Sequence, residues 1–251
     1  MSQRGIPVFL INTAFDEHAP EIVGRMRHFT RVYCRETPSA ERLAASGARV
    51  GVCPDLTYAL ELGTVGWRPG DAIVVLDTTV ATKNRKLHRF CRENDLRFQP
   101  IRTSPRLIRI TDPRNLMRIA RFNAKKYVGK LAPGSYALNR YSNAVASTQT
   151  FVRLLAEDTR VVIAARFHGV CFCMKVGVPF LAISSNTPKI EGMLADAGLG
   201  DRMLDIADLD LKAIESRSLW TTTHEERRQR YMADTKERIS KMFDDIAQAV
   251  R

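Results

Sequence analysis

The sequence predicts an α/β protein built on parallel sheets. Short apolar runs rich in β-branched residues alternate with segments of helical period, and most of these runs end in a polar turn. The length of 251 residues allows one large domain or a short two-lobed protein. Hydrophobic residues at 45% and charged residues at 26% are ordinary globular values, which exclude disordered and fibrous classes.

The first predicted region covers residues 1–66 and reads as a partial N-terminal Rossmann-like lobe. We expect its strands at 6–11, 32–34 and 49–53. Its helices are expected over 20–29 and in a short segment that has Ser39 as its N-cap and ends at Gly47. A stretch marked by Pro and Gly, 63–70, predicts a hinge after this region.

The second predicted region, 67–222, reads as a full C-terminal Rossmann-like lobe, and a long helix over 223–251 closes the chain. The strands of the second region are expected at 71–77, 97–101, 160–165, 179–184 and 203–206. Its helices are expected at 84–94, 144–155, 170–176 and 188–197. The closing helix carries an apolar stripe through Tyr231, Ile239, Met242, Phe243, Ile246 and Val250.

Cysteine usage argues against a disulfide-bonded or zinc-binding protein, and hydropathy argues against a membrane-spanning or secreted one. The five cysteines are odd in number and irregularly spaced, with no CxxC pair, so we expect buried thiols rather than disulfides or a zinc site. No apolar run approaches the ~20 residues that span a bilayer, and the start MSQRG is too polar for a signal peptide. A cytoplasmic protein that does not span a membrane, without metal or cofactor, is therefore expected.

Positive charge is concentrated in the basic segment 102–140. Ten Lys or Arg stand there against one Asp, which accounts for nine of the twelve net positive charges. The spacing predicts a helix with Leu116, Ile119, Ala120 and Phe122 toward the core. A polyanion-binding face is predicted at Arg114, Arg118, Arg121, Lys125 and Lys126. Nucleic acid, an anionic glycan or a lipid diphosphate would suit it, and so would a merely solvated basic face.

Two successive strand-to-helix turns carry the residues best suited to chemistry. Parallel α/β sheets bind ligands beyond the carboxyl ends of their strands, where helix N-termini offer N–H groups and a positive dipole. The first turn holds Arg166, His168 and Gly169, and the second holds Ser185, Asn186, Thr187 and Lys189, with Pro188 expected at the first helical position. We expect a carboxylate or phosphate site there. The alternative is that Arg166 pairs with a carboxylate and His168 caps a helix.

The stretch FVRLLAEDTRVVIAARFHGVCFCMKVGVPFLAISSNTPKIEGMLADAGL strongly resembles the polysaccharide pyruvyl transferase family. The shared pattern is an apolar strand, an R-x-H-G-like turn, a helix, a G-x-P-F strand and a polar turn ending in Lys. An upstream stretch, VYCRETPSAERLAASGARVGVCPDL, resembles an earlier block of that family. The resemblance implies a GT-B-like fold of Rossmann-type parallel sheets, with a shortened N-terminal lobe.

The resemblance also implies a function. Members of the family transfer a pyruvyl group from phosphoenolpyruvate to a hydroxyl of a sugar-containing acceptor. Carried over by position, Arg166 and His168 fall at the catalytic donor site and Lys189 in the following turn. The acceptor side would include Asn12, Arg35, Glu36 and Asp55 at strand ends of the first region, although Arg35 paired with Glu36 or Asp55 could equally be structural.

Two alternatives stay open at this point. One is a nucleotide-sugar-dependent glycosyltransferase that acts on a polyanion such as modified DNA. The other is a non-catalytic anion-binding assembly subunit, suggested by the shortened lobe. A homo-oligomer or a partner chain would be one way to complete that lobe.

Overall fold

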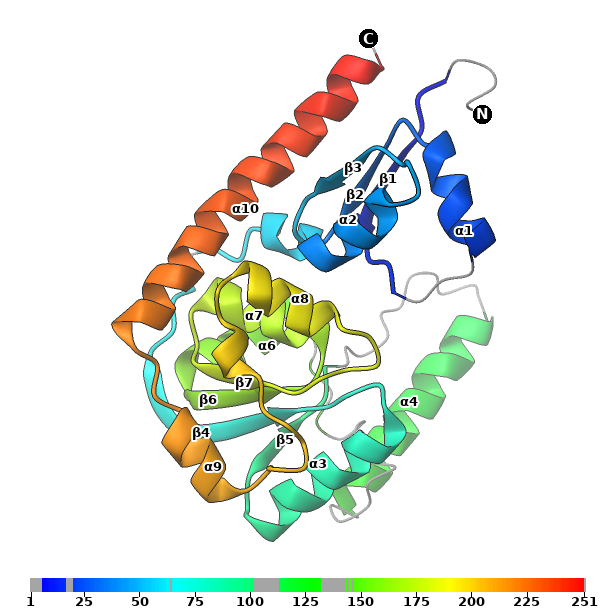
Figure 1. Ribbon diagram of the computed structural model, residues 1–251. Helices are drawn as coiled ribbons and strands as arrows, with labels where there is room; N and C mark the ends of the chain where they lie inside the picture. Colours follow the sequence, from blue (N-terminus) through cyan, green and yellow to red (C-terminus); the bar gives the residue numbers. More distant parts are fainter. Residues whose placement is uncertain are drawn as a thin grey trace. The chain divides into compact units, whose positions relative to one another are not determined.

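The computed structural model describes residues 6–16, 20–63, 65–101, 113–131, 143, 145 and 147–250, and it divides into two compact units (Figure 1). Unit 1 comprises Met1–Glu61, Ser184–Met203 and Trp220–Arg251, and unit 2 comprises Leu62–Ile183 and Leu204–Leu219. Each unit has its own parallel sheet, which confirms the predicted α/β class with Rossmann-type sheets.

Unit 1 is built on a three-stranded parallel sheet of order β1-β2-β3. The strands are β1 (Phe9–Thr13), β2 (Arg31–Cys34) and β3 (Val50–Val52). Helix α1 (Pro20–Arg25) with the 3-10 turn η2 (Met26–His28) joins the first pair of strands, and α2 (Thr37–Ala44) joins the second. The core is small and apolar: Val32 and Cys34 of β2 pack with Ala40 and Leu43 of α2 and with Phe15.

Unit 1 also contains segments from far along the chain. These are helix α8 (Lys189–Asp196), the 3-10 turn η4 (Gly200–Arg202) and the 28-residue helix α10 (Thr222–Ala249). The 3-10 turn η3 (Leu56–Ala59), which follows β3, belongs to the same unit. The two units thus differ from the predicted lobes, because α8 and η4 belong to unit 1, with the first sheet, and not to unit 2.

Helix α10 is anchored to unit 1 at both ends. At its start, Thr221 and His224 form a capping box, and His224 Nε2 lies 2.7 Å from Oδ2 of Asp201. Toward its end, Asp245 Oδ2 accepts hydrogen bonds from Arg31 and Tyr33 of β2, both at 2.8 Å. The predicted apolar stripe is buried at Tyr231, Ile239 and Met242, whereas Phe243 is 49% and Val250 65% exposed.

Unit 2 is built on a four-stranded parallel sheet of order β5-β4-β6-β7. The strands are β4 (Pro69–Leu76), β5 (Arg97–Gln99), β6 (Thr159–Ala164) and β7 (Phe180–Ala182). The chain leaves β4 toward one side of the sheet and later returns to add β6 and β7 on the other side. The strand order therefore reverses between β4 and β6, which is the point where open α/β sheets form a ligand crevice.

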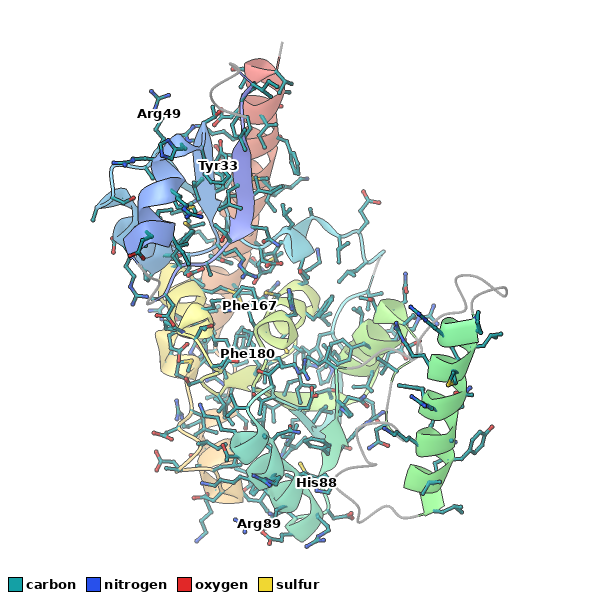
Figure 2. The ribbon with its side chains drawn as sticks, turned by 90° about the vertical axis from the view of Figure 1, so that its right-hand side faces the viewer. Tyr33, Arg49, His88, Arg89, Phe167 and Phe180 are labelled. Carbon is teal, nitrogen blue, oxygen red and sulfur yellow. The ribbon has the colours of Figure 1, made fainter. Side chains whose placement is uncertain are left out.

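The two faces of this sheet bury alternate residues of the central strands. Ile73, Val75, Val161 and Ile163 pack toward α3 (Ala81–Glu93) and α9 (Leu211–Arg217) in one core. The opposite face is covered by α6 (Thr148–Glu157) and α7 (Phe167–Val176), and Figure 2 shows Phe167 and Phe180 inside the unit. Both side chains are buried, at 8% and 0% exposure.

Several predicted element boundaries are wrong. Residue Glu36, not Ser39, holds the N-cap position of α2, because the Ser39 hydroxyl is inside the helix and accepts the Phe15 N–H at 2.7 Å. Helix α6 begins at Thr148, where Ser147 caps it. The strand expected at 203–206 is absent from the described chain, where only Met203 forms an isolated bridge, and the short helix α9 was not predicted.

The helix expected in the basic segment is confirmed as α4 (Pro113–Leu131), but its predicted core face is wrong. Phe122 is buried and Ile119 half-buried, whereas Leu116 and Ala120 are exposed. The predicted polyanion-binding side chains on α4 are exposed, except for the half-buried Lys126. The rest of the basic segment, 102–112 and 132–140, lies outside the described residues.

All five cysteines are buried free thiols, as predicted. Burial raises the pKa of Cys34 and Cys91 to about 12, so neither is a reactive thiolate near neutral pH. None of the helices in the described part of the chain is both long and apolar enough to cross a membrane.

Candidate functional site

The candidate site lies at the carboxyl ends of β4 and β6, where the strand order of unit 2 reverses. Asp77 follows β4 and is 6% exposed, and Arg166 follows β6 with 31% of its side chain exposed. The Arg166 Nη2 donates a hydrogen bond of 2.6 Å to Asp77 Oδ2. The second carboxylate oxygen accepts the backbone N–H of Ile101 at 2.9 Å. One oxygen of the buried carboxylate thus holds the guanidinium, and the other is held by the backbone.

Arg166 retains hydrogen-bonding capacity beyond this ion pair. Its Nε is buried and has no hydrogen-bond partner among the described residues. A buried donor without an acceptor is costly, by about 1–3 kcal/mol. The exposed 31% of the side chain is separate from this buried donor, and it is the part of Arg166 that an anionic ligand could reach.

Helix α7 begins at Phe167, three residues earlier than predicted, and this places the whole turn at its N-terminus. Arg166 holds the N-cap position without a side-chain capping bond, and His168 lies in the first turn with an exposed side chain. The His168 ring contacts the Phe167 ring edge-on, with centroids 5.7 Å apart. The exposed imidazole and the guanidinium of Arg166 therefore belong to one helix start, whose dipole favours an anion.

Gly169 serves close packing rather than direct ligand contact. A Cβ on this residue would lie 2.7 Å from Leu76 Cδ1 and 3.0 Å from Ile101 Cδ1. The absence of a side chain lets the first turn of α7 approach the end of β4, and this approach holds Arg166 near Asp77. The predicted donor-binding role of Gly169 stays a prediction.

The second predicted turn follows β7, which pairs with β6 through Val162–Phe180 and Ala164–Ala182. The prediction that the two turns follow neighbouring strands is confirmed. From Ser184 onward, however, the chain is part of unit 1. Whether Ser185, Asn186, Thr187 and Lys189 act on the same anion as Arg166 stays a prediction.

Within this second turn, α8 begins at Lys189, and Pro188 holds the N-cap position instead of the first helical position. The Ser185 hydroxyl donates to Asn186 Oδ1 at 3.2 Å. The Thr187 hydroxyl is buried without a hydrogen-bond partner in the described chain. Thr187 is thus the residue of this turn with the clearest unused polar group.

The residues predicted for the acceptor side gather at the carboxyl ends of the strands of unit 1. Arg35 Nη1 donates to Asp55 Oδ2 at 2.9 Å, and the other Asp55 oxygen accepts the Thr57 N–H at 2.8 Å. Asn12, which adopts a left-handed conformation with φ of 55°, accepts the Leu56 N–H at 3.3 Å. Arg35 therefore pairs with Asp55, which is one of the two structural pairings expected as the alternative from the sequence. A role of these residues toward an acceptor stays a prediction.

Glu36 lies beside this pair and is 3% exposed. Burial raises its pKa, while the Ser39 hydroxyl and the charges of Arg35 and Lys189 oppose the rise. Its Oε2 has no hydrogen-bond partner among the described residues. The structure thus brings Lys189, predicted on the donor side, to Glu36, predicted on the acceptor side, within one unit.

Asp77 is a residue of the candidate site that was not predicted from the sequence. It ends the apolar run DAIVVLD, and an acidic residue at the carboxyl end of a buried strand was the signal available.

Among the described residues, no three His, Cys, Asp or Glu side chains gather in a way that could hold a metal ion.

A family model for polysaccharide pyruvyl transferase matches residues 2–187. The chain belongs to this family. The matched range contains Asp77, Arg166, His168 and the second turn up to Thr187. Lys189 and α10 lie beyond the matched range.

Two further comparisons were made with this family member. No curated protein sequence matches this chain. Among solved structures, it is similar to a mutant O-GlcNAc transferase from Thermobaculum terrenum, with 14% sequence identity and a TM-score of 0.47. The match covers 90% of this chain and 46% of the other, so this chain spans about half the length of that structure.

Proposed function

We propose that this protein transfers a pyruvyl group from phosphoenolpyruvate to a sugar-containing acceptor, with the donor bound at Arg166 and His168. Membership of the pyruvyl transferase family supports the reaction class. The observation that carries the site is the Asp77–Arg166 ion pair at the reversal point of the unit 2 sheet.

Phosphoenolpyruvate suits this site because it carries a carboxylate and a phosphate. The exposed part of the Arg166 guanidinium would hold one of these anions, while Nη2 stays bonded to Asp77. Each charge-assisted hydrogen bond contributes about 1.5–3 kcal/mol to binding. Asp77 is a positioning residue in this scheme, since it touches Arg166 and not the donor.

His168 would supply the proton that starts the reaction. Imidazole is the side chain that exchanges protons most readily between pH 5 and 8. Protonation of the methylene carbon of phosphoenolpyruvate makes its C2 electrophilic, and an acceptor hydroxyl then adds to C2 and loses its proton. Departure of phosphate and addition of a second hydroxyl at C2 close a cyclic ketal, with the former methylene now a methyl group.

A thermal-shift panel tests the donor. We expect phosphoenolpyruvate to raise the melting temperature of the wild type more than a nucleoside diphosphate or a UDP-sugar does, because ligand binding to the folded state stabilises it. Arg166→Ala should lose that shift. Arg160→Ala is the matched control, since Arg160 is exposed at the opposite end of the same strand.

Product analysis completes the test. Mass spectrometry of a sugar acceptor incubated with protein and phosphoenolpyruvate should show the added pyruvyl group, with release of phosphate. Stabilisation by a UDP-sugar alone, with glycosyl transfer to the acceptor, would replace the proposal by the glycosyltransferase alternative. Donor binding without product from any donor would indicate the non-catalytic alternative.

A further inference from the structure

Helix α4 presents an apolar stripe to solvent. Five of its large apolar side chains are exposed: Leu116 44%, Met117 53%, Tyr127 70%, Val128 50% and Leu131 86%. At 3.6 residues per turn, these residues with Ala120 and Ala124 fall within one arc of roughly 120°. A contiguous exposed apolar face of this kind is unusual on a water-soluble surface and marks an interaction site.

The arc is bordered by positive charge. On one side lie Arg114, Arg118, Arg121 and Lys125, and on the other lie Lys126 and Lys130. The 19 residues of α4 contain no Asp or Glu, so the helix carries six positive charges. The buried residues Phe122 and Gly129 lie opposite the apolar arc, so this is the covered side of α4.

Both views place α4 at the periphery of unit 2 (Figures 1 and 2). A helix with one apolar face, flanking basic residues and too many charges to cross a bilayer is typical of helices that lie in a membrane interface. The apolar arc would enter the acyl boundary, and the Arg and Lys side chains would meet anionic headgroups. Nucleic acid or an anionic glycan would use the charges but leave the apolar arc in water.

We infer that the protein attaches peripherally to an anionic lipid surface through α4. The inference is independent of the donor, because it uses no residue of the Arg166 site. The partner it assigns to the basic residues of α4 has both a negative surface and an apolar interior. Such a partner also accounts for the exposed apolar side chains of α4, which a purely polyanionic partner would leave unexplained.

Flotation of the full chain with lipid vesicles tests the inference. At about 0.1 M salt we expect binding to vesicles of phosphatidylcholine with about one third phosphatidylglycerol, and little binding to pure phosphatidylcholine. The double variant Tyr127→Gln, Leu131→Gln should partition about tenfold more weakly. Arg118→Gln with Arg121→Gln should weaken partitioning more than tenfold, at roughly fivefold for each charge near the surface.

Matched controls separate this effect from general loss of apolar surface. Leu219→Gln with Val250→Gln changes two side chains of similar exposure, 70% and 65%, away from α4 and should leave partitioning unchanged. Retention on heparin should fall for the arginine variant but not for the Tyr127 and Leu131 variant. The inference is overturned if the wild type binds heparin or DNA but no vesicles, or if the α4 and control variants partition alike.

Discussion

Arg166 Nη2 and Asp77 Oδ2 lie 2.6 Å apart and join positions that are 89 residues distant in the chain. They meet because β4 and β6 are adjacent in the sheet and run in the same direction, with Val74 beside Val162. The pair fixes the only guanidinium in the R-x-H-G-like turn at the edge where parallel sheets bind ligands. Its integrity is therefore the first property to test.

Replacing Asp77 with Asn should weaken both folding and donor binding. The change removes the charge opposite a mostly buried guanidinium, and we expect the free energy of unfolding to fall by about 2 kcal/mol. The dissociation constant for phosphoenolpyruvate should rise about tenfold, because Arg166 is no longer held. Urea denaturation and calorimetric titration measure the two effects. Asp71→Asn, an exposed position at the start of the same strand, should change neither.

Replacing His168 with Ala should abolish turnover but preserve donor binding within a few-fold. Loss of a general acid typically costs 10²–10⁴ in rate, at roughly constant ground-state affinity. Initial rates of phosphate release and a phosphoenolpyruvate titration separate the two quantities. His28→Ala removes an exposed histidine from unit 1 and serves as the control. Wild-type turnover in the His168 variant would remove this residue from the mechanism.

Replacing Gly169 with Ala should destabilise the protein by about 1–2 kcal/mol, since the new Cβ would overlap buried Leu76 at 2.7 Å. The displaced start of α7 should also reduce donor affinity. Gly24→Ala is the contrasting control: nothing lies within 4 Å of its Cβ position in α1, and the substitution should stabilise by about 0.5–1 kcal/mol. Equal melting temperatures for the two variants would contradict the packing role.

Replacing Glu36 with Gln should raise the free energy of unfolding, relative to wild type, more at high pH than at low pH. Burial raises the pKa of Glu36, so the ionised form is disfavoured in the folded protein and its contribution to stability falls as the pH rises through that pKa. The free energy of unfolding of the variant relative to wild type should therefore increase between pH 5 and pH 8. Glu41→Gln, exposed on the same helix, should show no such trend. Parallel pH profiles for all three proteins would refute the expectation.

Replacing Glu225 with Gln should destabilise the protein near neutral pH by about 1 kcal/mol, after allowance for partial solvent exposure. Hydrogen bonds from Arg228, Gln229 and Trp220 lower the pKa of Glu225 from 4.5 to about 2. Because the folded pKa lies below the unfolded value, the contribution is complete above the unfolded pKa and is lost as the pH falls toward 2. Chemical denaturation from pH 7 to pH 2.5 should show the difference from wild type shrinking, and Glu226→Gln provides the exposed control.

Local sequence was sufficient to predict most of the elements of both sheets. Apolar runs such as VVIAA and FLAIS are typical of strands covered on both faces, and the polar turns after them mark the carboxyl edge of a parallel sheet. Arg166 and His168 were found in this way, because their signal lies within one strand-to-helix turn. The buried thiols and the helix in the basic segment were confirmed for the same reason, because their signals also lie within short stretches of sequence.

Tertiary structure decided what depends on partners distant in the chain. The carboxylate that holds Arg166 comes from another strand, Lys189 lies near Glu36 because α8 joins the first sheet, and Ser39 hydrogen-bonds to Phe15 instead of capping its helix. The exposure of Leu116 and Ala120 on α4 was equally hidden, because helical period defines an apolar face but not what packs against it. Pairing and burial are properties of the folded chain, since they depend on which surfaces meet and not on the order of residues within one element.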